Sequence, residues 1–263
     1  MKFLLYAFMA VSVGVMIFGL IKQKEGFEWG KPLTVVGAGV ALLCVLIQMF
    51  AGAGPSTKQI MDDQMRFARA ATEKLGMHLA EKHAGGKALV LTFPAVYGED
   101  LTNDAMMEGL KKGLNGKVEI IVEKIQPELP PGAKPTDQNA DMYAAPMEAW
   151  FTPERFDKLV QPYIGKVDLL ITFQGLPMEP GKLKFWNMKP LPKVVLAGGS
   201  IAEFRKAIEQ GVVIAAVTTN PKANFELRPK SDVNKTFELR YLLITPENLG
   251  SMAGDYKGLF NSP

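Results

Sequence analysis

The stretch Ala88–Phe93, ALVLTF, decides the fold class of this chain of 263 residues. It is a short apolar run that ends at Pro94, which is typical of a strand buried on both faces of a parallel sheet. Apolar runs of similar character follow it at intervals that leave room for helices: Lys117–Ile125, Val167–Phe173, Lys193–Ala197 and Val212–Thr218. Strands that alternate with helices in this way predict a doubly wound, mostly parallel α/β domain with three layers.

Capping residues mark where the predicted helices begin. Ser56 and Gln59 form a capping box at the start of a helix that ends before Gly85. Thr152 stands directly before Pro153, a proline at the first position of another helix. The remaining expectations are a helix over 103–114 with Thr102 as N-cap, a helix from the Ser200–Glu203 capping box to Gln210, and a half-exposed edge strand over Thr236–Thr245.

The first of these helices carries an apolar stripe at alternating four- and three-residue steps. Its members are Met61, Met65, Ala68, Thr72, Leu75 and Leu79. Such a stripe either packs on the protein's own sheet or forms a self-associating stalk, and the small Ala68 and polar Thr72 favour the sheet.

Two apolar runs without charged residues precede the helix, at Phe3–Ile21 and Leu33–Phe50. Each has about the length that a helix needs to cross a hydrocarbon layer of ~30 Å. No small-residue cleavage site follows the first run, so we expect a retained transmembrane hairpin rather than a signal peptide. Gly37 and Gly39 are expected to let the two helices pack closely. The predicted organisation is therefore a hairpin over 1–55, a connecting helix over 56–86 and an α/β domain over 87–263.

This hairpin makes the lipid bilayer an expected partner and the bacterial inner membrane the expected location. The lysines and arginines near its ends favour a head on the cytoplasmic side by a narrow margin.

The charge balance argues against nucleic acid as a partner. Residues 1–55 hold four of the 30 basic and two of the 27 acidic residues, which leaves 26 and 25 in the rest of the chain, a net charge of +1. Nucleic-acid binding needs a clustered excess of positive charge. Cys44 is the only cysteine, so a disulfide within the chain and a cysteine zinc site are excluded. His78 and His83 stand five residues apart and do not share a helix face, so neither a metal nor another cofactor is expected.

A family resemblance rests on Ala88–Ile125, with its strand, Tyr97-Gly98 loop, helix around Met107-Glu108-Gly109-Leu110 and second strand. This stretch resembles the opening of type I periplasmic binding proteins of the sugar-binding kind. Val167–Ile171 and Val194–Gly199 are similar to the third and fourth strands of the same lobe. The resemblance covers Ala88 to about Thr219 and implies the fold of one lobe, because the chain is too short for the second lobe that closes on a ligand in that family.

Candidate binding residues follow the predicted strands, because ligands of open α/β sheets bind beyond the carboxyl ends of the strands. Gly198, Gly199 and Ser200 either point backbone N–H groups at an anion from a helix start or only make the turn into the helix, and the turn is the favoured interpretation. Gln174 and Thr219 end two other strands at the same edge.

Aromatic side chains occur on the two long loops, 126–151 and 176–192. Trp150, Phe185 and Trp186 either form a contact face for a partner or ligand or fold down over the sheet as additional core.

The sequence contains no GxSxG motif, and its one thiol lies in the hairpin, so no catalytic residue is assigned and an enzyme is not expected. The predicted function is a non-catalytic scaffold or accessory subunit of a membrane assembly, with a protein partner or a homo-oligomer. The alternative is a tethered sensor domain that binds a sugar or an anion.

Overall fold

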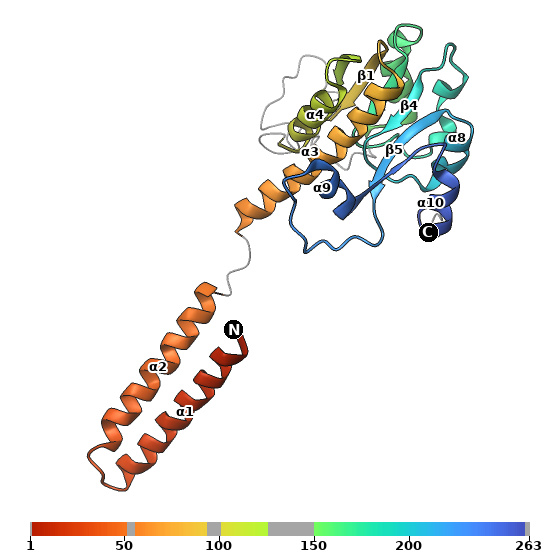
Figure 1. Ribbon diagram of the computed structural model, residues 1–263. Coiled ribbons are helices and arrows are strands. Elements are labelled where there is room, and N and C mark those ends of the chain that lie inside the picture. Colours follow the sequence, from red (N-terminus) through yellow and green to blue (C-terminus); the bar gives the residue numbers. More distant parts are fainter. Residues whose placement is uncertain (1, 52–55, 94–100, 126–149, 261–263) are drawn as a thin grey trace. The chain divides into compact units, whose positions relative to one another are not determined.

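A computed structural model describes residues 2–51, 56–93, 101–125 and 150–260 (Figure 1). The chain divides into two compact units, Met1–Ile60 and Met61–Pro263. The first unit contains the hairpin of α1 (Lys2–Lys24) and α2 (Gly30–Ala51) and the first residues of α3 (Thr57–Lys82). The second contains the rest of α3 and a six-stranded α/β domain.

The sheet of the second unit has the strand order β2-β1-β3-β4-β5-β6. The strands β1 to β5 pair in parallel, and β6 closes one side by pairing antiparallel to β5. Their bounds are β1 Lys87–Thr92, β2 Glu119–Lys124, β3 Leu169–Thr172, β4 Lys193–Leu196, β5 Val213–Thr219 and β6 Tyr241–Ile244. The predicted mixed α/β domain with three layers is therefore confirmed, and each predicted parallel strand is present.

Alternate residues of the strands supply two separate cores, one on each face of the sheet. On one face, Val90 and Ile171 pack with α3 and with α4 (Leu101–Leu114). On the other face, Leu89 and Leu170 pack with α7 (Pro153–Val160), α8 (Arg205–Glu209) and α10 (Leu249–Asp255). This period of two is the property of a strand buried on both sides.

The later part of the stripe on α3, from Ala68 to Leu79, packs in the core of the domain, whereas Met61 at its start is exposed by 53%. Leu75 and Leu79 are fully buried, and Thr72 is buried with its hydroxyl bonded to the carbonyls of Ala68 and Arg69. The helix begins at the predicted capping box: the Ser56 N–H donates to Gln59 Oε1 at 3.1 Å, and the Gln59 N–H donates to Ser56 Oγ at 3.2 Å. The contacts of the stripe favour the domain's own sheet over a self-associating stalk.

Helices α3 and α4 approach each other main chain to main chain. A Cβ added to Gly109 would lie 2.2 Å from the Arg69 carbonyl oxygen, and one added to Gly113 would lie 2.1 Å from the Glu73 carbonyl oxygen. From the opposite helix, a Cβ on Gly76 would lie 2.7 Å from the Leu110 carbonyl oxygen. Glycine is therefore required at these positions because any side chain would push the helices apart.

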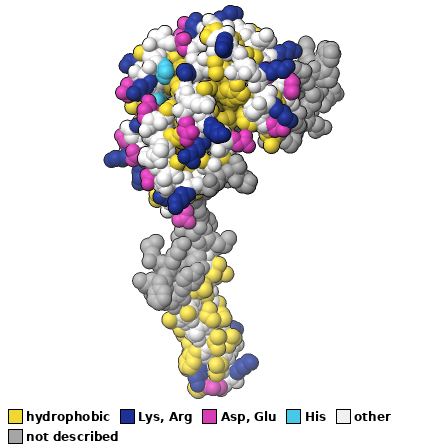
Figure 2. Space-filling model, turned by 90° about the vertical axis from the view of Figure 1, so that its right-hand side faces the viewer, with side chains coloured by type: hydrophobic (Ala, Val, Ile, Leu, Met, Phe, Trp, Pro, Cys, Tyr) yellow, Lys and Arg dark blue, Asp and Glu magenta, His cyan; other side chains and the backbone are white. Residues whose placement is uncertain are grey.

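The hairpin also packs through glycines. A Cβ on Gly37 would meet the backbone of Met16 at 2.8 Å, whereas Gly39 has open space around it. The space-filling view shows apolar side chains over the hairpin and interspersed charges over the α/β unit (Figure 2). Among the hairpin residues on the surface, Val11, Val35 and Leu42 are exposed by 64%, 66% and 64%.

The prediction of a transmembrane hairpin is wrong. In the described part of the chain, none of the helices combines the length and the apolar character that a membrane span requires. Two further predictions depended on that hairpin: the lipid bilayer as a partner, and the inner membrane as the location with the head on its cytoplasmic side. Neither is supported without it. The sequence argument used the length and the apolar, uncharged character of two runs, and these features of the sequence did not establish a span.

Three local predictions also differ from the structure. Residues 236–240 belong to α9 (Val233–Arg240), so only the second half of Thr236–Thr245 is a strand. A helix forms here instead of a strand because Asp232 caps its first turn, and the Asp232 carboxylate accepts from the Lys235 N–H at 2.8 Å. Thr102 lies inside α4 rather than before it. The segment after Ser200 forms a 3-10 turn, η5 (Ala202–Phe204), and the five-residue α8 in place of one regular helix.

Candidate functional site

The order of the strands reverses between β1 and β3. The connection from β1 leads to β2 on one side of this point. The connection from β3 leads to β4 on the other side. In doubly wound sheets of this order, the loops at the reversal separate at the carboxyl edge and leave a crevice for ligands. The candidate site is therefore the carboxyl edge around β1 and β3, of which residues 94–100 and 126–149 lie outside the described chain.

The loops that follow β3 and β4 pack together directly. A Cβ on Gly198 would lie 2.5 Å from the Phe173 carbonyl oxygen, and one on Gly199 would lie 3.1 Å from the Gln174 carbonyl oxygen. Gly199 and Gly175 also have φ angles of +88° and +89°, a conformation that favours glycine. The Gly198–Gly199 pair thus has a packing role that accounts for both glycines.

This packing places Gln174 beside Gly199, both exposed at the same edge, and Ser200 follows. Ser200 is exposed, and its Oγ accepts from the Ala202 N–H at 3.3 Å, which makes a local turn. The helix dipole is weak support for an anion here because only a 3-10 turn and the short α8 follow. Thr219 is also exposed at the carboxyl edge, but it lies beyond β4, at the pair that β5 makes with β6.

The aromatic residues of the long loops separate into two groups. Phe185 is fully buried and packs edge-on against Phe156, with ring centroids 5.5 Å apart. Trp186 is half-buried, and its indole N–H donates to the Pro180 carbonyl at 2.7 Å. Trp150 lies against Phe93 at the end of β1, with ring centroids 6.1 Å apart. The burial of Phe185 favours core over contact face for that residue.

Asp157 holds the loop of Phe185 in place, and the sequence analysis did not identify it. Its carboxylate accepts the N–H groups of Lys184 and Phe185, each at 2.9 Å, and the residue is buried on α7. Charge-assisted bonds of this kind are among the stronger hydrogen bonds in proteins. An acidic residue on the apolar side of a short helix is the signal that could have revealed it.

Two clefts border these elements. One of about 430 Å³ lies between β2 and α7 and includes Arg155, Lys158 and Tyr163. Tyr163 donates its hydroxyl to the Glu123 carboxylate in this cleft, and that bond raises the pKa of Tyr163. The other, of about 340 Å³, lies beside α8 and includes Trp186 and Phe204. Neither cleft includes Gly198, Gly199, Ser200, Gln174 or Thr219.

The two histidines lie at the end of α3 and are partly buried rather than fully solvated. Burial lowers the pKa of His78 and of His83, and nearby lysines add to the effect while Glu247 and Asp168 oppose it. No three His, Cys, Asp or Glu side chains of the described residues are close enough together to hold a metal ion.

No family model matches this chain, and no curated protein matches it either. Solved structures with a related arrangement include the TorS sensor domain–TorT complex, at 15% identity and a TM-score of 0.45, covering 76% of this chain. The arabinose-binding protein AraP from Geobacillus stearothermophilus is similar at 12% identity and a TM-score of 0.41, covering 74% of this chain. A LacI-type transcriptional regulator from Bacteroides fragilis is similar at 10% identity and a TM-score of 0.42, covering 70%.

The chain spans 61%, 63% and 61% of the lengths of these three structures, respectively. These structures include a sugar-binding protein, the kind of protein that the sequence resembles, and each of the three TM-scores is below 0.5. At these identities and TM-scores, the likeness does not extend to ligand or partner.

Proposed function

We propose that the α/β unit, Met61–Pro263, is a sensor domain that binds a small polar molecule, a sugar or an anion, at the carboxyl edge of its sheet. The observation that carries the proposal is the reversal of strand order between β1 and β3, which opens this edge in a doubly wound sheet. The alternative of a scaffold without a ligand has no comparable support from the geometry.

The exposed groups at the edge suit binding rather than proton transfer. Gln174 offers an amide that both donates and accepts, Ser200 offers a hydroxyl, and the turn at Gly199 exposes main chain. None of these groups titrates near neutral pH, so they recognise hydroxyl groups or oxyanions by hydrogen bonds. A non-enzymatic role is part of the proposal for this reason.

The test is a thermal-shift measurement on the full chain with arabinose, glucose, galactose and inorganic phosphate as separate probes. A molecule that binds only the folded state at a hundredfold excess over its Kd stabilises the protein by about 2.7 kcal/mol. Such a shift with one of the probes is the expected result. If all four probes leave the melting temperature unchanged, the proposed ligand class is wrong.

Variants then locate the site. Gln174→Ala and Ser200→Ala should each abolish most of the shift and leave the melting temperature without ligand nearly unchanged, because both side chains are exposed. Gln161→Ala is the matched control, since Gln161 is an exposed glutamine of the short turn η2 (Gln161–Tyr163). A shift that persists in both edge variants would place the ligand elsewhere.

A further inference from the structure

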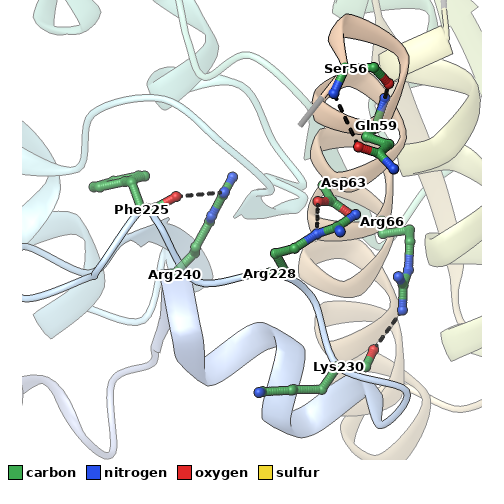
Figure 3. A network of polar contacts seen from close by, with 8 residues as sticks. All are labelled: Ser56, Gln59, Asp63, Arg66, Phe225, Arg228, Lys230 and Arg240. Atoms are coloured by element: carbon green, nitrogen blue, oxygen red, sulfur yellow. Dashed lines mark hydrogen bonds and ion pairs between the residues drawn. The ribbon is translucent and has the colours of Figure 1, made fainter. Parts of the chain in front are cut away.

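Residues 220–232 form a strap that leaves the carboxyl end of β5 and returns along α3 before α9 begins (Figures 1 and 3). The strap contains no helix or strand, and its large apolar side chains Phe225 and Leu227 are exposed by 61% and 41%. Pro229, in contrast, is buried. Polar contacts to α3 add to this burial in holding the strap.

Two contacts bind the strap to the first turns of α3. Arg228 pairs with Asp63 through two bonds, at 2.7 and 3.3 Å, and the ion pair raises the pKa of the guanidinium. Arg66 donates to the Lys230 carbonyl at 2.9 Å (Figure 3). Both arginines are exposed, so each contact is worth little alone and can open at low cost.

Arg240 makes the third contact and joins three parts of the unit. It is buried at the end of α9, and its guanidinium lies 3.6 Å from the ring centroid of Phe67 on α3. It donates to Gln64 Oε1 at 2.7 Å and to the Phe225 carbonyl at 3.4 Å. Burial of the side chain lowers the pKa of Arg240.

The backbone of the same residue is bonded to the end of β5. The Asn220 N–H donates to the Arg240 carbonyl at 2.7 Å, directly after the pair of Thr219 with Tyr241. One residue thus contacts the carboxyl edge of the sheet through its main chain and α3 through its side chain. A shift of Asn220 moves the backbone from which the guanidinium extends.

We infer that Arg240 and the strap form a latch that couples the carboxyl end of β5 to the first turns of α3. A conformational change at this edge is transmitted to α3 through the Arg240 side chain, with the Asp63–Arg228 pair as the part that opens. The latch stands on these contacts and does not depend on the proposed ligand.

The experiment perturbs one end and measures the other by hydrogen exchange on the full chain. Asn220 Oδ1 accepts from the Lys222 N–H at 2.9 Å, so Asn220→Ala loosens the turn where the strap leaves β5. The expected result is exchange about fivefold faster at the amides of residues 61–69 on α3. Asn248→Ala is the matched control, because Asn248 holds a similar turn at Thr245, outside the strap.

The second experiment repeats the measurement in a protein whose latch is already broken. In Arg240→Met, which keeps apolar contact with Phe67, these amides exchange faster from the outset and Asn220→Ala adds less than about a twofold further increase. Asp63→Asn with Arg228→Gln, at a half-buried aspartate and an exposed arginine, tests the same point should Arg240→Met fail to fold. The inference is overturned if Asn220→Ala leaves α3 unchanged, or if its effect is the same in the broken-latch background.

Discussion

The two faces of the sheet are covered in different ways. On the face of α3 and α4, long regular helices approach at main-chain distance, and small residues fill the contact. On the face of α7, α8 and α10, short helices and 3-10 turns are joined by large rings, among them Phe151, Phe156 and Phe185. The glycine contact between α3 and α4 leaves no room for a side chain, and the packing of the opposite face depends on large rings that fill space. Substitutions of opposite kinds should therefore damage them.

The largest effect is expected on the face of α3 and α4. Gly113→Val should lower the free energy of unfolding by more than about 4 kcal/mol, because its Cβ would overlap the Glu73 carbonyl oxygen and the two main chains must separate. Denaturant unfolding measures the loss. Gly250→Val in α10 is the control, since the space around Gly250 is open. Equal losses in the two variants would show that close approach does not define this face.

Removal of a ring should be the next largest effect, on the opposite face. Phe185→Ala should cost about 3–4 kcal/mol, because the fully buried ring leaves a cavity between α7 and the sheet. Phe225→Ala, at an exposed phenylalanine, should change stability by less than about 1 kcal/mol. A small loss of unfolding free energy in Phe185→Ala would instead favour a role for Phe185 in a contact face.

A smaller loss is expected where the aromatic face is held by a polar anchor. Asp157→Asn should cost about 1–2 kcal/mol, because the amide accepts one of the two N–H groups of Lys184 and Phe185 and directs its own donors at the other. Asp255→Asn, at an exposed carboxylate, is the control and should have little effect on the same unfolding curve. Should the two variants unfold alike, Asp157 does not anchor the loop.

The smallest effect concerns the two partly buried histidines at the end of α3. Their folded pKa values lie below the ordinary value of 6.5, so the unfolded chain takes up protons first as the pH falls. The stability that the two neutral histidines contribute is thus fully present above pH 6.5 and is lost as the pH falls through their folded pKa values.

Between pH 7.5 and 5.5, the melting temperature of the natural chain should fall by roughly one or two degrees more than that of His78→Gln with His83→Gln. The nearby Glu247, Asp168 and lysines are present in both proteins, so the difference isolates the histidines. An equal fall in both proteins would mean that their burial does not affect folding.

The sheet was predictable because each parallel strand is a separate apolar run. The inner strands, such as Leu89–Leu91 in β1, are buried on both faces, whereas β2 at the edge of the sheet is exposed or half-buried throughout. The prediction failed where a polar residue that caps a helix competes with the alternation of apolar and polar residues that is typical of a strand. Phe237, Leu239 and Tyr241 alternate like a strand, yet Asp232 starts a helix that includes the first two. Run length likewise failed for the hairpin.

The candidate site was predictable only in outline. The rule of the carboxyl edge selected Gln174 and Ser200, which are both exposed, but no pattern in the sequence indicated that Gly198 sits against the Phe173 carbonyl. Asp157 and Arg240 escaped notice for the same reason: their partners lie 27 and 176 residues away in the chain. Contacts of such separation follow from the tertiary fold and leave no local signal.

The glycine contact between α3 and α4 has a consequence for how this sequence can change over time. Because the contact is made by main chain, it places strict limits on Gly76, Gly109 and Gly113 and almost none on exposed neighbours such as Met77 and Lys111. Mutational tolerance along these helices should therefore alternate sharply within a single turn. Relatives of this chain could lose nearly all detectable similarity over α3 and α4 and still retain three small residues at this spacing.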